Sequence, residues 1–261
     1  MAIPTTPKEQ NLNAAAVVPA AGRGERLGPG APKALRDLGG VPILVHAVRA
    51  LTEARAVRLV VVAAPPGGGA AEVRSLLDEH GLHGKDVLVV EGGATRQESV
   101  RLALEALPAS ADVVLVHDAA RPLVPVEVVD AVADAVAGGA DAVVPAVPLA
   151  DTVKQVEPAG RPGDPEPVVA TPERARLRAV QTPQGFRRAL LVEVHAKALA
   201  EEAAADGEGL PPVTDDAGLV ERFGGRVVVV RGHEEAFKVT RPLDLVLAEA
   251  VLARRRAVDG Y

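Results

Sequence analysis

The 261-residue sequence contains no cysteine, which excludes disulfides, thiolate nucleophiles and cysteine-ligated zinc. The first thirteen residues lack the apolar core of a secretory signal. The longest apolar run, 59–64, is far below the roughly 20 residues that span a bilayer. We therefore expect a cytoplasmic protein with no membrane segment.

Aromatic residues make up only 2% of the chain, while apolar residues reach 48%. The predicted core is therefore sizeable and consists of valine, leucine and alanine. This length suits a single α/β domain. The net charge of −6, without a basic stripe, argues against a nucleic-acid partner.

Short continuous apolar runs predict strands that are buried on both faces of a parallel sheet. They occupy residues 14–19, 59–64, 87–90, 113–117, 142–147 and 227–230.

Helical patterns alternate with these runs. Thr95 and Glu98 form a capping box before one helix, and Pro125 suits the first position of another. Later helices are predicted at 187–205 and 242–256. The alternation predicts an α/β fold with a doubly wound, mostly parallel sheet. In such sheets, ligands bind beyond the carboxyl ends of the strands.

Residues 149–171 interrupt this alternation with closely spaced proline and glycine. The segment is interpreted either as a surface insertion or as an association arm whose flanks, 152–156 and 168–171, pair as an antiparallel ribbon. The expected organisation is a flexible N-terminal segment, one domain that includes this arm, and a short tail, at residues 1–13, 14–256 and 257–261.

A glycine-rich loop, Pro19–Gly28, follows the first predicted strand. Its small residues allow backbone N–H groups to approach a polyanion. The glycine spacing does not match a dinucleotide fingerprint, and the Gly-Lys-Ser/Thr of a P-loop is absent. Arg26 and Lys33 remain, and they are predicted to neutralise charge on an α-phosphate during in-line attack. The alternative is a solvated loop with incidental basic residues.

The motif HDAARP at 117–122 ends a predicted buried strand in ionisable residues. Asp118 is expected to bind a Mg²⁺–triphosphate or a sugar hydroxyl, and Arg121 a phosphate. The alternative is a structural ion pair between these two residues. His117 is interpreted as a packed, hydrogen-bonded histidine.

Further polar candidates are scattered along the chain. In GGATRQES at 92–99, two glycines precede a helix start, and Ser99 either reaches a base or phosphate or belongs to a plain helix start. The acidic pair after Thr214 either caps a helix or contributes to a site. Lys238 precedes the last predicted helix, and Arg174 follows the arm. His80 and His83 lack a third ligand nearby, so no protein metal site is expected.

Taken together, these motifs resemble those of the 2-C-methyl-D-erythritol 4-phosphate cytidylyltransferase family of the non-mevalonate isoprenoid pathway. The resemblance runs from Ala14 to about Arg254. It rests on PAAGRGERLG with Pro32-Lys33, GGATRQES, HDAARP, DTVK at 151–154, QTPQ at 181–184, Thr214-Asp215 and KVTRPLDL, in this order.

The resemblance implies a Rossmann-like nucleotidyltransferase domain with a projecting β-arm that builds a homodimer. It implies transfer of CMP from CTP to the polyol phosphate with release of pyrophosphate, and Mg²⁺ bound mainly through the CTP phosphates. By match to the family motifs, Arg26 and Lys33 stabilise the transition state. The nucleotide cradle is Ala20, Ala21, Gly22, Gly93 and Ser99. The acceptor is held by Arg174 and Lys238, aided by Asp118, Arg121, Thr152 and Thr214, with Arg174 acting in trans.

Three departures from the family pattern are Ala34, where glutamine is usual, Glu173, where aspartate is usual, and the pair Ala236-Phe237, where Asn-Ile is frequent. None of them removes a predicted charged group. Three alternatives stay open at this point: a cytidylyltransferase for another polyol phosphate such as ribitol 5-phosphate, a non-catalytic nucleotide-binding protein, and an NAD-dependent enzyme.

Overall fold

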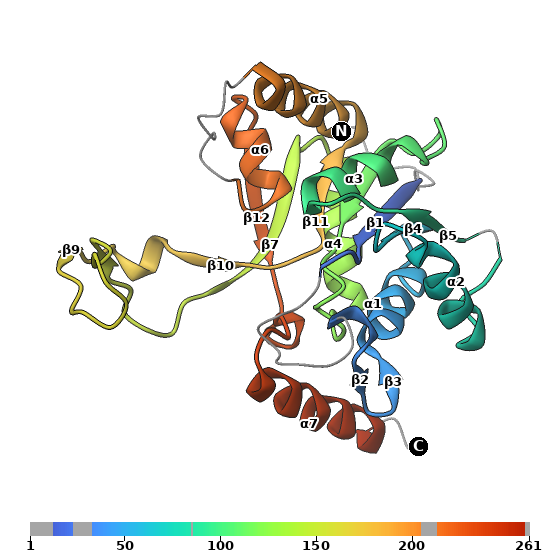
Figure 1. The fold of residues 1–261 in the computed structure, drawn as a ribbon, viewed down its shortest axis with the longest axis horizontal. Coiled ribbons are helices and arrows are strands. Elements are labelled where there is room, and N and C mark those ends of the chain that lie inside the picture. Colours follow the sequence, from blue (N-terminus) through green and yellow to red (C-terminus); the bar gives the residue numbers. More distant parts are fainter. Residues whose placement is uncertain (1–12, 23–32, 85, 205–212, 259–261) are drawn as a thin grey trace, which may run out of the picture.

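A computed structural model describes residues 13–22, 33–84, 86–204 and 213–258 (Figure 1). The predicted flexible segment therefore falls almost wholly outside the described residues, as does Arg26. The strands are β1 (Ala14–Pro19), β2 (Asp37–Leu38), β3 (Val41–Pro42), β4 (Val57–Ala64), β5 (Val87–Glu91), β6 (Val113–Val116), β7 (Ala142–Pro148), β8 (Gln155–Val156), β9 (Val168–Ala170), β10 (Arg178–Val180), β11 (Gln184–Arg187) and β12 (Val227–Arg231). The α-helices are α1 (Ile43–Thr52), α2 (Gly69–Glu79), α3 (Arg96–Glu105), α4 (Val126–Ala137), α5 (Arg188–Ala204), α6 (Asp216–Arg222) and α7 (Pro242–Val258).

The apolar runs form the parallel part of one central sheet. Within the described residues this sheet has eight strands, in the order β10-β7-β11-β6-β1-β4-β5, with β12 pairing on β7. Val17 of β1 lies beside Val61 of β4 on one side and Val116 of β6 on the other, both in parallel register. The predicted doubly wound, mostly parallel sheet is confirmed.

Two short strands that the sequence did not predict run against this direction. β11 inserts antiparallel between β6 and β7, and β10 pairs antiparallel with the end of β7. β12 pairs parallel with β7. This side of the sheet therefore contains both parallel and antiparallel strands. Three of them, β7, β10 and β11, come from residues 142–187.

Alternate residues of β1 face two separate layers of helices, because successive side chains of a strand point to opposite faces. Ala14, Ala16 and Val18 pack into a cluster with α1, α2 and α4. Ala15 and Val17 pack into a second cluster with α3, α5 and α6. A run apolar at every position is what this two-sided burial requires.

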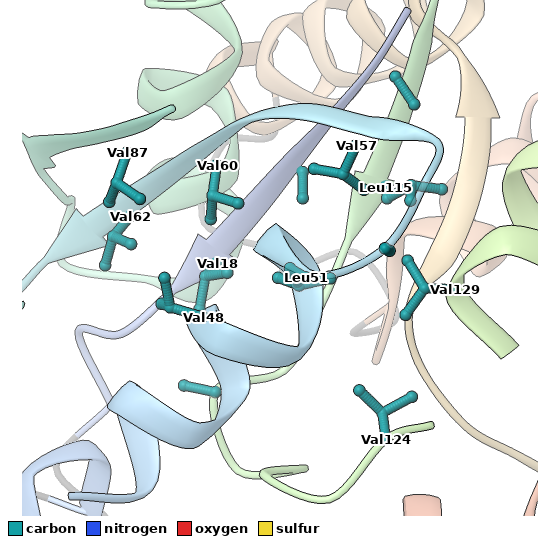
Figure 2. Packing of buried hydrophobic residues seen from close by; sticks show 14 of the residues in the cluster. Val18, Val48, Leu51, Val57, Val60, Val62, Val87, Leu115, Val124 and Val129 are labelled. Carbon is teal, nitrogen blue, oxygen red and sulfur yellow. The ribbon is translucent and has the colours of Figure 1, made fainter. Parts of the chain in front are cut away.

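Figure 2 shows part of the first layer from close by. Val48 and Leu51 of α1 lie under β1 and β4, near Val18 and Val60, and all four are fully buried. A third, smaller cluster joins α7 to the β2–β3 hairpin through Leu38 and neighbouring residues. The core thus consists mainly of aliphatic side chains, as the low aromatic content predicted, with Phe186 as a fully buried aromatic residue.

Several helix boundaries differ from the sequence prediction. Pro125 has extended backbone (ψ 143°) and is the N-cap of α4, so the helix begins at Val126 and not at the proline. α7 continues to Val258, two residues into the predicted tail, whose last residues lie outside the described part. Thr95 caps α3 as expected, but Glu98 binds the N–H of Ala94 instead of closing the capping box on Thr95.

The proline-rich segment projects from the body as an arm (Figure 1). Its flanks pair antiparallel as predicted, but over a shorter length: Gln155 lies opposite Ala170 and Val156 opposite Val168. Lys154 donates a hydrogen bond to the hydroxyl of Thr171 (2.8 Å) across this ribbon.

Candidate active site

A pocket of about 260 Å³ opens where β1 and β6 end and α3 begins. This is the edge of the sheet at which a doubly wound fold is expected to bind ligands. The pocket lining comprises Pro19, Ala20, Ala21, Gly22, Ala34, Ala94, Thr95, Arg96, Ser99, Asp118, Ala119, Ala120, Lys238 and Thr240.

One wall of the pocket consists of small residues and backbone. The N–H of Ala20 donates to the carbonyl of Ala63 (2.8 Å), which holds the end of β1 beside β4. Open space surrounds the Cα of Gly22, so the backbone there is accessible. Lys33 begins a short 3₁₀ helix, Lys33–Leu35, while its side chain and Arg26 lie outside the described residues.

The glycine turn before α3 completes this wall. Gly92 approaches β4 so closely that a Cβ would lie 2.5 Å from the carbonyl oxygen of Ala64. Ser99 is fully buried, accepts a hydrogen bond from the N–H of Gly93 (3.1 Å) and donates one to the carbonyl of Thr95 (2.8 Å). Within this chain, the Ser99 hydroxyl therefore holds the turn in shape at the pocket edge.

A second wall of the pocket is charged and centres on Asp118. Its carboxylate lies 2.8 Å from the Nζ of Lys238, 3.5 Å from the Nε of Arg96 and 3.9 Å from the Nε of Arg121. Burial alone would raise the pKa of Asp118, but the three cations more than offset it and hold that pKa well below its ordinary value. Asp118 is therefore a carboxylate at every physiological pH.

Arg121 contacts both Asp118 and the backbone. Its Nη1 donates to the carbonyl of Ala236 (2.7 Å) and its Nη2 to that of Val180 (3.2 Å). Burial lowers the pKa of Arg121, and the charge of Asp118 acts in the opposite direction. The guanidinium thus joins the loop before α7 to the end of β10, beside the pocket.

His117 is fully buried and hydrogen-bonded, as predicted from the sequence, and it is neutral. Desolvation lowers its pKa to about 4. Its Nε2–H donates to the carbonyl of Arg121 (3.2 Å), so its Nδ1 accepts from the hydroxyl of Thr182 (3.0 Å). The Thr182 oxygen accepts in turn from the N–H of Asp118 (3.0 Å). This chain of bonds fixes the backbone of the Asp118 loop.

Comparisons with known proteins show which family the chain is part of. A family model described as 2-C-methyl-D-erythritol 4-phosphate cytidylyltransferase matches residues 14–254. The chain belongs to this family. A Streptomyces coelicolor protein of that name is 71% identical over 248 residues, which cover 95% of this chain and 87% of that protein. A Streptomyces avermitilis protein of that name is 68% identical, and the match covers 98% of each chain.

Solved structures agree as well. A 4-diphosphocytidyl-2C-methyl-D-erythritol synthase from Anaerococcus prevotii superposes with a TM-score of 0.75 at 26% identity, covering 93% of this chain and 97% of the other. The Thermus thermophilus cytidylyltransferase superposes with a TM-score of 0.67 at 38% identity, covering 90% and 97%. The Rossmann-like nucleotidyltransferase fold of the family is thus shared over nearly the whole chain.

The structure brings some of the predicted cytidylyltransferase residues together and leaves others apart. Those that line the pocket are Ala20, Ala21, Gly22, Ser99, Asp118 and Lys238. Gly93 and Arg121 lie next to it through bonds to Ser99 and Asp118. Thr152 and Arg174 are exposed on or beside the arm, and Thr214 is exposed before α6; none of them lines the pocket of its own chain.

Sequence reasoning missed two residues that shape the site. Arg96 lines the pocket and contacts Asp118, and Thr182 holds the Asp118 loop. Both lie inside motifs that carried the resemblance, GGATRQES and QTPQ. Their roles depend on contacts across 22 and 64 residues of chain, which no local pattern reveals.

Proposed function

We propose that this pocket transfers CMP from CTP to 2-C-methyl-D-erythritol 4-phosphate, giving 4-diphosphocytidyl-2-C-methyl-D-erythritol and pyrophosphate. The observation that carries this proposal is the division of the pocket into two walls. The wall of small residues and backbone suits a nucleotide, and the charged wall, with Lys238 beside Asp118, suits a phosphorylated polyol.

In this reaction an oxygen of the acceptor phosphate attacks the α-phosphorus of CTP, and the bond from that phosphorus to the β-phosphate oxygen breaks. Pyrophosphate leaves with the electron pair. No side-chain nucleophile is needed, so the protein contributes positioning and charge. Arg26 and Lys33 stabilise the charge that develops at the α-phosphate.

The donor set suits Mg²⁺ held mainly by substrate oxygens. Asp118 is the one carboxylate among the described residues that line the pocket, and no group of three potential metal ligands occurs in the described part of the chain. Mg²⁺ typically uses one or two carboxylates together with substrate phosphates. Mg²⁺ would therefore be held mainly by the CTP phosphate oxygens, whose charge it would neutralise, because Asp118 already pairs with three cations.

The decisive experiment is an acceptor assay. Purified protein is incubated with CTP, Mg²⁺ and either 2-C-methyl-D-erythritol 4-phosphate or ribitol 5-phosphate, and pyrophosphate release is followed. We expect turnover with the methylerythritol phosphate. Clear preference for ribitol 5-phosphate would overturn the substrate, and the names of the similar Streptomyces proteins do not favour it. Saturable NAD binding would revive the alternative of an NAD-dependent enzyme.

We further propose that the arm builds a homodimer and carries Arg174 and Thr152 to the site of a second copy. Three features support this: the arm projects from the body (Figure 1), Val168 and Val169 are each 56% exposed on it, and neither Arg174 nor Thr152 lines the pocket of its own chain. Deletion of residues 152–170 should abolish both the dimer and the activity.

A mixing experiment tests the trans site directly. Arg174→Ala and Lys33→Ala proteins, each inactive alone, are unfolded together and refolded. A mixed dimer has one site with Lys33 from one chain and Arg174 from the other, so activity should return to about a quarter of wild type. If Arg174 acts in its own chain, neither site is complete and no activity returns.

Among the helices that the structure describes, none is long and apolar enough to cross a membrane. The cytoplasmic location remains a prediction from the sequence.

A further inference from the structure

A buried acid–base pair lies behind the charged wall of the pocket. Asp216, the first residue of α6, accepts from the Nε2 of His195 on α5 (2.9 Å) through one oxygen. Its other oxygen accepts from the Nη1 of Arg96 (2.7 Å). The side chains of His195 and Asp216 are 2% and 1% exposed, and neither residue lines the pocket.

Arg96 joins this pair to the pocket. Its Nη1 faces Asp216, while its Nε lies 3.5 Å from the Oδ1 of Asp118. The second oxygen of Asp118 lies 2.8 Å from the Nζ of Lys238. A chain of alternating basic and acidic side chains thus runs from His195 through Asp216, Arg96 and Asp118 to Lys238. Lys238 is partly exposed at the pocket.

This arrangement is costly for the fold, since a carboxylate loses its hydration when it is buried and must be compensated by its partners. The compensation is effective: burial would raise the pKa of Asp216, but the charges and hydrogen bonds of Arg96 and His195 hold it below its ordinary value. Neither Asp216 nor His195 has a role in the proposed reaction. An apolar pair of similar volume would fill the same space without this cost.

We propose that His195 and Asp216 are positioning residues that hold the Nη1 end of Arg96 away from Asp118, so that Lys238 keeps its close contact with Asp118. Without this anchor, the terminal nitrogens of Arg96 are free to form a two-pronged pair with Asp118. The carboxylate would then turn towards Arg96, and Lys238 would lose its partner. The inference rests on the proposed function, because Lys238 is taken to bind the acceptor phosphate.

The chemistry of His195 provides a discriminating set of variants. The bond to Asp216 needs a donor at the Nε2 position, which the amide of glutamine supplies and leucine does not. His195→Gln should therefore preserve the anchor, and His195→Leu should remove it at similar volume. Asp216→Asn keeps the shape of the side chain but removes its charge. Glu193→Gln, on the exposed face of the same helix, is the matched control.

The first readout is steady-state kinetics with thermal melting of every variant. His195→Leu and Asp216→Asn should raise the KM for the methylerythritol phosphate by about 10-fold, the scale of one charged hydrogen bond, with little change in the KM for CTP. His195→Gln and Glu193→Gln should stay within about 2-fold of wild type. An unchanged acceptor KM in both His195→Leu and Asp216→Asn, with only a lower Tm, would overturn the proposal.

The second readout does not depend on turnover. The Nε–H resonance of Arg96 in ¹⁵N-labelled protein, identified by its loss in Arg96→Lys, reports the contact with Asp118. It should move in His195→Leu and Asp216→Asn and stay in place in His195→Gln. If the resonance keeps its chemical shift in both His195→Leu and Asp216→Asn, the inference is overturned. Failure of wild-type protein to use either acceptor overturns the proposed function alone, because the resonance still tests the anchor. If His195→Leu does not fold, Asp216→Asn provides both readouts.

Discussion

The two halves of the central sheet are stabilised by different interactions. In the parallel half (β1, β4, β5 and β6), aliphatic side chains fill both faces of the strands. In the mixed half (β7, β10, β11 and β12), buried amides hold the chain as well. Gln181 donates to the carbonyl of His233 (2.8 Å) and accepts from its N–H (3.1 Å). Gln184 donates to Asp215 (2.6 Å) and accepts from the N–H of Ala217 (3.1 Å).

This difference follows from what each half supplies to the pocket. Apolar burial is non-directional, so it builds a rigid platform but does not aim individual side chains. Hydrogen bonds are directional, and buried ones are costly to leave unmade. The mixed half contains short irregular segments that need such bonds: Gln181 holds His233, Gln184 holds the start of α6, and Thr182 holds the backbone of Asp118. The parallel half supplies the backbone at 20–22 together with Arg96, which follows β5, and Asp118, which follows β6.

The largest expected effect tests whether the parallel half supplies catalytic charge. Arg26→Ala and Lys33→Ala should each lower kcat by at least ~100-fold, the usual effect of removing one transition-state donor. CTP binding should change far less. Both are measured by steady-state kinetics and CTP titration. Arg58→Ala, at an exposed position of β4, is the charge-matched control. Normal turnover in either loop variant would count against the assigned roles.

The stability of the protein should depend on pH through His117, which lies where the two halves of the sheet meet. The unfolded chain takes up a proton near pH 6.5, whereas folded His117 resists protonation down to about pH 4. Its stabilising contribution is therefore full above pH 6.5 and is lost as pH falls to 4, by about 3 kcal/mol.

Urea unfolding at a series of pH values measures this dependence. His117→Asn keeps an acceptor for Thr182 but cannot take up a proton, so the variant should show a shallower pH slope. Some slope remains, because burial also lowers the pKa of His46. An identical slope in variant and wild type would show that other groups cause the pH dependence.

Two isosteric substitutions, one in each direction, compare the interior of the parallel half with that of the mixed half. Val62→Thr buries an unpaired hydroxyl in β4, and Thr182→Val removes the hydroxyl that joins Asp118 to His117. Each should lower the free energy of unfolding by roughly 2 kcal/mol. Only Thr182→Val should also lower the turnover of the folded enzyme, since the Asp118 loop loses its hydrogen bond. Equal turnover in both variants would show that the hydroxyl of Thr182 does not position the Asp118 loop for the reaction.

The smallest effects concern the glycine turn of the parallel half. A Cβ at position 92 would meet the backbone carbonyl of Ala64 at 2.5 Å, which cannot move without disturbing β4. The three atoms nearest to a Cβ at position 93 all belong to the flexible Glu98 side chain, which can move if it gives up its bond to the N–H of Ala94. Gly92→Ala should cost about 2 kcal/mol and Gly93→Ala about 1 kcal/mol in chemical denaturation. A larger loss in Gly93→Ala would mean that Glu98 cannot give way.

The sequence predicted the strands best where every residue of a strand is buried. The run at 14–19 predicts β1 closely, because a strand buried on both faces needs an apolar residue at every position. The prediction failed at β11, where Gln184 and Gly185 carry no strand signal. Gly185 belongs there because β11 packs so tightly on α4 that a Cβ would lie 2.5 Å from Val132. That constraint comes from a helix 53 residues earlier in the chain.

The candidate site was predicted in the same uneven way. Of the predicted nucleotide cradle, Ala20, Ala21, Gly22 and Ser99 line the pocket, whereas Gly93 lies next to it through its bond to Ser99. The anchor of Arg96 was not predictable, because Asp216 lies 120 residues away and its motif indicates only a helix cap. Arg121 left two interpretations open, and its contacts include both Asp118 and two backbone carbonyls.

By itself, the sequence determined the α/β class, the loop that bears Arg26 and Lys33, and the order of the motifs that place the chain in its family. These properties are local, since hydrophobic periodicity and loop composition are written in neighbouring residues. Only the tertiary structure decided that β11 runs antiparallel between β6 and β7, that Asp118 contacts three cations, and that His195 and Asp216 lie behind Arg96. Those contacts join residues distant in the chain, and the energy of a buried charge depends on what the fold places beside it.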